Sequence, residues 1–429
     1  MALSNILMEQ YTNILREELL VAMGCTEPIA IAYAAAILRK TMGHPVERIQ
    51  ASLSGNIIKN VKSVIVPATG GLYGIEAAIC AGLVSACPEK KLEVLTVIKE
   101  EDHEKILHCL KNCVITVNEK ESPYVFDLEL RGENPEHTCL VKITGSHTNV
   151  VKVMLDKQDL TESYRVSMQG ESIESTDRSV LNVQDIVAFA EQTPLDAIAP
   201  LLQRQIDMNI AICEEGLTNH YGAAIGKVLY GSGNAELKTV ARAYAAAGSD
   251  ARMSGCEMPV GIISGSGNQG ITASVPVVIY AREMGASQEL LLRSVLVSDL
   301  ITIHQKTGIG CLSAYCGAIS AGCGCAAGIC FLNGGRYYEI AHTLVNAVAI
   351  LSGTICDGAK PSCAAKIAMA VEAGILGYEM MKSGNQFYGG DGIVTKGVEN
   401  TIRNVGRLAR EGMSETDKEI IRIMLGTDC

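Results

Sequence analysis

Two groups of cysteines near the C-terminus have the residue types of a metal centre, in a chain of 429 residues with 16 cysteines. The first group lies in CLSAYCGAISAGCGCAAGIC (311–330) and the second in CDGAKPSC (356–363). The thiols stand among Gly and Ala, and Pro361 is placed to begin a helix that carries Cys363 in its first turn. A helix N-terminus stabilises the negative charge of a thiolate-ligated cluster. These segments predict an oxygen-sensitive iron-sulfur centre, and their spacing fits zinc as well.

A further cysteine, Cys25, lies in Gly-Cys-Thr-Glu-Pro (24–28), directly before a predicted helix. Thr26 is suited to cap this helix and Pro28 to its first turn. A thiol at a helix N-terminus faces unpaired amide groups and the positive end of the helix dipole, which lowers the thiol pKa. Cys25 is therefore a candidate ligand or acid-base group, and the alternative is a buried, inert cysteine.

Three polar segments are further candidates, one after the apolar run 260–263 and two at the ends of predicted strands. Residues 264–270 (SGSGNQG) are typical of a Gly-rich turn that opens a helix and presents N–H groups to an anion such as a carboxylate. They do not form a Walker A loop, because no Lys-Ser/Thr follows the glycines, and a simple flexible turn fits them equally well. The other two are Ser-Gly-Asn (54–56) and Gly-Ser-His-Thr-Asn (145–149). His147 could hold a carboxylate or move a proton, whereas an isolated loop histidine is more often structural.

Composition limits the classes of function. The chain is 48% hydrophobic, which allows a large core and two or three domains. A net charge of -11, without a basic stripe, argues against a nucleic-acid partner. The opening residues 5–20 are polar and amphipathic, so no signal peptide is expected and the predicted location is the reducing cytoplasm. Residues 307–335 carry no charge, but their small side chains predict a buried helix and not a membrane span.

The elements that must position these residues fall into two predicted regions. Apolar residues recur at helical spacing over 5–23 and 30–38. From about residue 48, β-rich runs are separated by helical patterns at 73–83 and 103–110. The β-rich runs are 49–53, 92–98, 114–117, 125–130, 139–143 and 150–155. A polar stretch at 169–178 ends this region, and beyond Val183 the chain is nearly all helical and rich in Ala and Gly.

The predicted fold class is α+β. An Ala/Gly-rich helical domain at residues 1–45 and 175–429 is expected to carry the metal centre and the substrate site. A smaller α+β domain at residues 46–174 is expected to be inserted after the first two helices. The Ala/Gly-rich helical surface favours a homodimer.

Together the motifs resemble the L-cysteine desulfidase family, which is related to the α chain of the iron-sulfur L-serine dehydratases. The matching segments span nearly the whole chain and are GCTEP at 24, SGN at 54, SGSGNQG at 264, QKT at 305, LSAYCGA at 312 and ICDGAKPSC at 355. The resemblance implies a [4Fe-4S] cluster held by Cys316, Cys356 and Cys363, with one iron open for substrate. It gives no role to the remaining cysteines of the region, which are expected to be small core residues: Cys311, Cys323, Cys325 and Cys330.

The resemblance also implies an activity, the α,β-elimination of L-cysteine to sulfide, pyruvate and ammonia, in which a thiophilic iron binds the substrate sulfur. Cys25 stands where the dehydratases carry a serine-rich substrate turn, which favours L-cysteine over L-serine. Cys25 would face the open iron or the substrate, or act as a fourth ligand. The candidate bases are, in order, Cys25 as thiolate, His147 and Lys306. The expected substrate-binding residues are Thr26, Glu27, Ser54, Asn56, Asn268, Gln269 and Gly270.

Three other kinds of protein fit part of this pattern. An iron-sulfur L-serine dehydratase would perform the same elimination on a hydroxyl group. A non-catalytic iron- or zinc-binding protein would use the cysteines as a structural staple or a sensor. A pyridoxal-phosphate lyase would perform the same net reaction, but no segment combines a Schiff-base lysine with a phosphate-binding loop.

Overall fold

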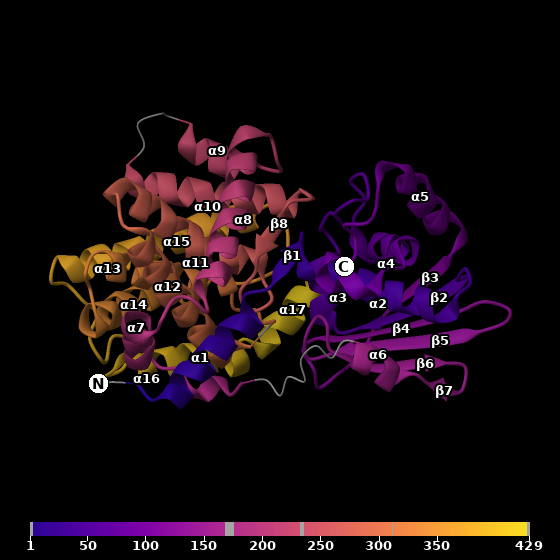
Figure 1. The fold of residues 1–429 in the computed structure, drawn as a ribbon, viewed down its shortest axis with the longest axis horizontal. Helices are drawn as coiled ribbons and strands as arrows, with labels where there is room; N and C mark the ends of the chain where they lie inside the picture. The colour runs from indigo at the N-terminus through magenta and orange to yellow at the C-terminus, as the bar shows by residue number, and fades with distance from the viewer. Residues whose placement is uncertain (1–2, 168–175, 232–235, 311, 427–429) are drawn as a thin grey trace.

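The computed structural model describes residues 3–167, 176–231, 236–310 and 312–426, so Cys311 and most of the polar stretch at 169–178 lie outside the described residues. A group of packed helices and a smaller sheet covered by helices make up the fold (Figure 1). The predicted α+β class is confirmed.

A mixed six-stranded sheet has the order β3-β2-β4-β5-β6-β7. Its strands are β2 (Arg48–Leu53), β3 (Val114–Glu119), β4 (Asp127–Glu133), β5 (Thr138–Thr144), β6 (Val150–Leu155) and β7 (Gln158–Asp159). β2 and β3 pair in parallel with Arg48 opposite Val114, and the other neighbours pair antiparallel. Alternate residues of β5, such as Val141 and Ile143, are buried, as expected for a sheet with one covered face.

Helices cover this sheet and connect its strands. They are α2 (Thr26–Met42), α3 (Gly55–Val61), α4 (Gly74–Ser85), α5 (His103–Asn112) and α6 (Thr161–Ser167). α2 packs against α4 and against β4 and β5. The predicted boundary at residue 45 therefore falls after a helix that packs with the sheet, and the predicted domain limits stay a prediction.

The strand predicted at 92–98 is wrong. A 3-10 helix, η1 (Pro88–Glu93), occupies the start of this segment, and a second, η2 (Glu100–Asp102), follows it. The apolar residues Leu92, Val94 and Leu95 are buried, and η1 packs against α2. The segment buries its apolar side chains without pairing with a strand, and a short apolar run does not distinguish these two outcomes.

The remaining helices form the larger group. They are α1 (Asn5–Glu18), η3 (Arg178–Val180), α7 (Val183–Gln192), α8 (Ala199–Thr218), α9 (Ile225–Tyr230), α10 (Leu237–Met253), α11 (Gly267–Met284), α12 (Gln288–Ile309), α13 (Gly317–Leu332), α14 (Tyr337–Leu351), α15 (Cys363–Lys382), α16 (Val398–Arg407), η4 (Leu408–Gly412) and α17 (Ser414–Leu425). α13 packs against α11, α12, α14 and α15 and is buried from Ala318 to Leu332.

Small residues allow this close packing around α13. A Cβ atom on Gly322 would lie 2.4 Å from the carbonyl oxygen of Ala370 on α15, and one on Gly324 would lie 2.1 Å from Oγ1 of Thr302 on α12. The buried small-residue helix predicted within 307–335 is confirmed. Cys323, Cys325 and Cys330 are buried in it, as predicted. Among the described residues, no helix is both long and apolar enough to cross a membrane.

A two-stranded antiparallel sheet joins the N-terminal segment to the larger group. β1 (Val21–Met23) pairs with β8 (Pro259–Gly261), and Ala22 lies opposite Val260. The helix predicted over 5–23 therefore ends at Glu18. This pairing brings the turn that follows β1 close to the turn that follows β8, and both turns reach the cavity described next.

Candidate functional site

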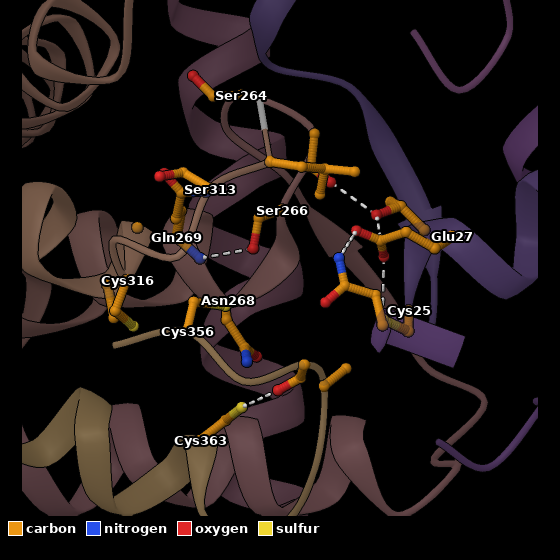
Figure 2. A pocket seen from close by; sticks show the side chains of 18 of the residues that line it. Cys25, Glu27, Ser264, Ser266, Asn268, Gln269, Ser313, Cys316, Cys356 and Cys363 are labelled. Carbon is orange, nitrogen blue, oxygen red and sulfur yellow. Dashed lines mark hydrogen bonds between the residues drawn. The ribbon is translucent and has the colours of Figure 1, made fainter. Parts of the chain in front are cut away.

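A cavity lies where the six-stranded sheet and its covering helices, here called the sheet unit, meet the larger helical group. Its lining comes from the α2 N-terminus, the β5–β6 loop, the end of α10, the start of α11, the end of α12 and the two cysteine segments. The lining residues include Cys25, Thr26, Glu27, Asn60, His147, Arg252, Ser264, Ser266, Asn268, Gln269, Lys306, Cys316, Cys356, Cys363 and Lys366. Figure 2 shows the three cluster-candidate cysteines on one side of the pocket, and Cys25 and Glu27 on the other.

The Cys25 turn begins helix α2, as the sequence predicts, but Cys25 and not Thr26 is the capping residue. The Cys25 thiol is buried and donates a hydrogen bond to Oε2 of Glu27, at 3.2 Å. Burial, together with the negative charge of Glu27, raises the Cys25 pKa well above its usual value. The prediction that the helix N-terminus favours the thiolate is therefore wrong, because desolvation and a carboxylate outweigh the helix dipole.

Glu27 is the centre of a hydrogen-bond network in the cavity. Its Oε2 also lies 3.2 Å from Thr26 Oγ1, and its Oε1 accepts from Asn60 Nδ2 at 3.2 Å. Burial alone would raise the Glu27 pKa, but interaction with the His147 imidazole and the Cys25 hydrogen bond lower the pKa to about 2. Glu27 is therefore an ionised carboxylate with several donors around it.

His147 reaches the cavity from the loop between β5 and β6. Its Nε2 is buried without a hydrogen-bond partner among the described residues and lies 3.9 Å from Glu27 Oε1. The ring packs against Phe126, with 4.8 Å between ring centroids, and against Gly265. A Cβ on Gly265, whose φ is +76°, would lie 2.8 Å from the imidazole, so glycine is required for this approach. The packing fixes the ring beside Glu27.

The loop that opens α11 forms another wall of the cavity. Ser266 caps the helix and its Oγ accepts from the Gln269 N–H, as the predicted Gly-rich turn requires (Figure 2). Ser264 has a left-handed backbone with φ of 47°, which is uncommon for a residue with a side chain. Asn268 and Gln269 line the cavity, and the buried Oε1 of Gln269 has no partner among the described residues. Open polar groups of this kind are typical of a ligand site.

The two cysteine segments are held together by backbone pairing. Tyr315 and Ile355 form an antiparallel bridge, the Cys316 N–H donates to Thr354, and the Cys356 N–H donates to Ala314 at 2.6 Å. Cys316 directly precedes α13, and Cys363 is the first residue of α15. This pairing brings both segments to one wall of the cavity.

The chemistry of this wall fits a thiolate-ligated cluster. Cys316, Cys356 and Cys363 all line the cavity, and every cysteine in the described ranges is free. Burial raises the Cys316 pKa to about 12, and the neighbouring Cys356 and Cys363 add to the rise. Two helix N-termini and Lys366 beside the three thiols stabilise the thiolate form that a bound metal group requires. These residues therefore suit an iron-sulfur group.

A single metal ion fits this wall less well. No group of three or more His, Cys, Asp or Glu side chains in the described ranges is placed to hold one ion. A four-iron cluster takes separate thiolates on separate irons, so its ligands surround a larger body than one ion does.

The predicted substrate-binding residues divide into two sets. Thr26, Glu27, Asn268 and Gln269 line the cavity, as do the candidate bases Cys25, His147 and Lys306. Three predicted residues do not line it: Ser54, Asn56 and Gly270.

Those three residues have packing contacts instead. Ser54 Oγ donates to Val125 O and accepts from the Asp127 N–H, so it joins α3 to β4. Asn56 donates to Asp417 on α17 at 2.7 Å. A Cβ on Gly270 would lie 2.0 Å from Gly261 O, which makes glycine necessary for packing α11 on β8. Sequence position alone did not separate these contacts from ligand contacts.

The lining residues that were not predicted include Asn60, Arg252 and Lys366. Asn60 holds Glu27, and Lys366 pairs with Asp357 and donates to Ile355 O at 2.9 Å. A signal for Arg252 and Lys366 is present in the sequence, because each is a single cation within a segment of small residues, AAAGSDARM and CAAKIAMA. An isolated charge inside a buried helix needs a partner or a function.

Comparisons with known proteins support a common family. Residues 89–422 match the family described as the serine dehydratase alpha chain. A UPF0597 protein of Desulfitobacterium hafniense is 51% identical over 417 residues, which cover 97% of this chain and 96% of the relative. UPF0597 proteins of Treponema denticola and Finegoldia magna are 45% and 44% identical, over 98% and 100% of their own lengths and 97% of this chain.

Proposed function

The chain belongs to the serine dehydratase alpha-chain family, and on that premise we propose that it is an iron-sulfur lyase that converts L-cysteine to sulfide, pyruvate and ammonia. One observation carries this proposal. Three thiols that suit a cluster line the same cavity as an ionised carboxylate and a histidine with an open nitrogen. Such a cavity combines a site for a soft metal with groups that can move a proton.

The proposed cofactor is a [4Fe-4S] cluster bound by Cys316, Cys356 and Cys363. When bound, it supplies a thiophilic Lewis-acid iron for the substrate sulfur. The N-termini of α13 and α15 and the side chain of Lys366 offset its negative charge. Cys25 lines the same cavity and is a candidate for a further contact with the cluster or the substrate.

We assign the proton transfer to His147. Its open Nε2 takes the proton from Cα, the electrons of the Cα–H bond form the Cα=Cβ bond, and the Cβ–S bond breaks to release sulfide. The Glu27 carboxylate, 3.9 Å away, stabilises the imidazolium that forms. Water then hydrolyses the released aminoacrylate to pyruvate and ammonia.

This assignment changes the order of the candidate bases. Cys25 is a poor base in this environment, because its raised pKa keeps the thiol protonated, and it already donates to Glu27. Lys306 is 4% exposed at the end of α12 and also lines the cavity. His147 is the candidate with an open nitrogen next to a carboxylate.

L-serine is the second candidate substrate, because the matched family is described as a serine dehydratase. A hydroxyl is a poorer leaving group toward a soft metal than a thiol and needs a harder Lewis acid or a proton donor. The presence of Cys25 in the cavity, where the resemblance places a serine-rich turn in the dehydratases, favours L-cysteine.

The test is product release by anaerobically purified protein from L-cysteine, with L-serine in parallel and a repeat after exposure to air. Formation of sulfide and pyruvate only from L-cysteine, with loss of this activity in air, supports the proposal. Formation of pyruvate from L-serine alone would make L-serine the substrate. Protein that retains iron and acts on neither amino acid leaves a structural or sensing role. His147→Asn is expected to lower kcat at least about a hundredfold. His137→Asn is the control, because His137 pairs with Asp156 at the surface.

A further inference from the structure

Arg252 is a buried cation on the wall of the cavity. It lies in the last turn of α10, is 2% exposed, and lines the cavity together with Asn268 and Ser266. A guanidinium stays charged in a protein, so this position places a permanent positive charge inside the site.

The hydrogen bonds of Arg252 leave part of the guanidinium open. Nη1 donates to Oδ1 of Asn268 at 3.0 Å, whereas the buried Nε has no partner among the described residues. No carboxylate within the described ranges forms an ion pair with Arg252, although Arg178 and Arg242 have such partners. A buried cation without an anion is costly, and the cost is offset when a ligand supplies the charge.

The surroundings of Arg252 favour an anion. A Cβ on Gly267 would lie 2.5 Å from Arg252 Nε, so the guanidinium packs directly against the first residue of α11. That helix has 18 residues, and its N-terminus adds the positive end of a dipole. The guanidinium and the α11 N-terminus therefore act on the same part of the cavity.

The cavity also contains groups of the opposite kind. Glu27 is ionised, and the Gln269 Oε1 is a buried acceptor without a partner among the described residues. Both Glu27 and Arg252 act electrostatically on Cys25, so the thiol lies within the reach of both charges. The cavity therefore contains both a cation and a carboxylate, as the binding of a zwitterion requires.

We propose that Arg252, held by Asn268, binds the α-carboxylate of an amino-acid substrate and so determines specificity for α-amino acids. Glu27 and the Gln269 amide then face the α-ammonium group. This inference rests on the proposed function, because it assumes that the cavity binds an amino acid. The Gly-rich turn at 264–270 was predicted to bind a carboxylate through its N–H groups. The present inference gives that role to the Arg252 side chain.

The test uses two ligands that cannot eliminate sulfide, L-alanine and L-alaninamide, with titration calorimetry on the anaerobic iron-loaded protein. The two ligands share the ammonium group and the methyl group, and only L-alanine has the carboxylate. Arg252→Gln is expected to weaken L-alanine about ten- to hundredfold and to leave L-alaninamide unchanged. Arg252→Lys keeps the charge without the planar fork and is expected to give an intermediate loss.

The control variant is Arg242→Gln, on the same helix but paired with Glu372 and outside the cavity lining. It should bind both ligands as the wild type does. Equal affinity of Arg252→Gln and the wild type for L-alanine would overturn the inference, as would an equal loss for both ligands. If Arg252→Gln does not fold, the ratio of the two affinities in Arg252→Lys decides.

The two proposals fail in different ways. Wild-type protein that binds neither ligand and converts no amino acid removes the proposed function, and the inference with it. Wild-type protein that releases sulfide from L-cysteine, while Arg252→Gln keeps the preference for L-alanine over L-alaninamide, removes only the inference about Arg252.

Discussion

The hydroxyl of Thr26 donates a 2.7 Å hydrogen bond to the carbonyl oxygen of Gly265. This bond joins the turn that carries Cys25 to the turn that opens α11, two segments more than 200 residues apart in the chain. The short β1–β8 sheet lies directly before both turns and holds the same pair together. The relative position of Glu27 and Ser266 therefore depends on a few contacts between distant segments.

Replacing Thr26 by Val should remove the hydrogen bond between the two turns while keeping the shape of the side chain. The partly buried Gly265 carbonyl would lose its partner, and we expect a loss of about 1–2 kcal/mol in the free energy of unfolding. The activity, kcat/KM for the substrate, should fall about tenfold because the two turns no longer hold one geometry. Urea unfolding and initial rates measure the two effects. Thr26→Ser restores the hydroxyl and should recover both values, and a Ser variant as impaired as Val would rule out this role of the hydrogen bond.

Replacing Cys316 by Ser should remove most of the iron. A serine at this position deprives a cluster of one of three proposed thiolates, and the expected result is a loss of bound iron and of the visible absorbance of the anaerobic protein. Cys323→Ala is the matched control, since Cys323 is 2% exposed within α13 and does not line the cavity. Iron analysis of both variants decides the assignment. Equal iron contents in the two would contradict the ligand role of Cys316.

The ionised state of Glu27 predicts how stability depends on pH. Its folded pKa of about 2 lies below the value of about 4.3 in an unfolded chain. Ionised Glu27 therefore stabilises the folded state fully above its unfolded pKa, and this stabilisation is lost as the pH falls toward its folded pKa. Its upper limit is about 3 kcal/mol. Urea unfolding of the wild type and Glu27→Gln should show a difference that shrinks from about pH 5 to about pH 3. A difference that stays constant over this range would show that Glu27 does not titrate as expected.

Asp417 forms a buried ion pair that connects the last helix to α3. Its Oδ1 lies 2.5 Å from Lys59 Nζ, and Lys59 is 2% exposed. Asp417→Asn leaves the lysine charge buried without an anion and should cost about 3 kcal/mol in the free energy of unfolding. Adding Lys59→Met should recover most of that loss. Glu415→Gln, which breaks an exposed pair on the same helix, should cost less than about 1 kcal/mol. Similar losses in Asp417→Asn and Glu415→Gln would contradict the prediction.

Periodicity and composition predicted the larger features of the fold. Long helical patterns, the strands 114–117, 139–143 and 150–155, and the buried small-residue helix α13 were all predicted, because each pattern repeats over enough residues to be distinctive. The strands β1 and β8 were missed, since three residues are too few for an alternating pattern. The run at 92–98 was mistaken for a strand because its burial against α2 does not depend on strand pairing.

Part of the candidate site could also be predicted from the sequence. Cys25, His147 and the three cluster-candidate cysteines could be chosen by residue type, and all of them line one cavity. The Cys25 pKa could not be predicted, because it depends on burial and on Glu27, two residues along the helix but facing the same thiol. Asn56 was misplaced because its partner, Asp417, comes from the far end of the chain.

The loop between Cys356 and Cys363 rests on the sheet unit. Gly358, with φ of +94°, packs so closely on α3 that a Cβ would lie 2.3 Å from the Lys59 carbonyl oxygen. The same α3 provides Asn60, which holds Glu27. During synthesis the residues of the sheet unit that line the cavity therefore leave the ribosome long before residues 316–363, which complete the cavity. On the proposed function, iron could be loaded only after residues 316–363 have left the ribosome, and a chain truncated before α15 would lack Cys363, one of the three proposed ligands.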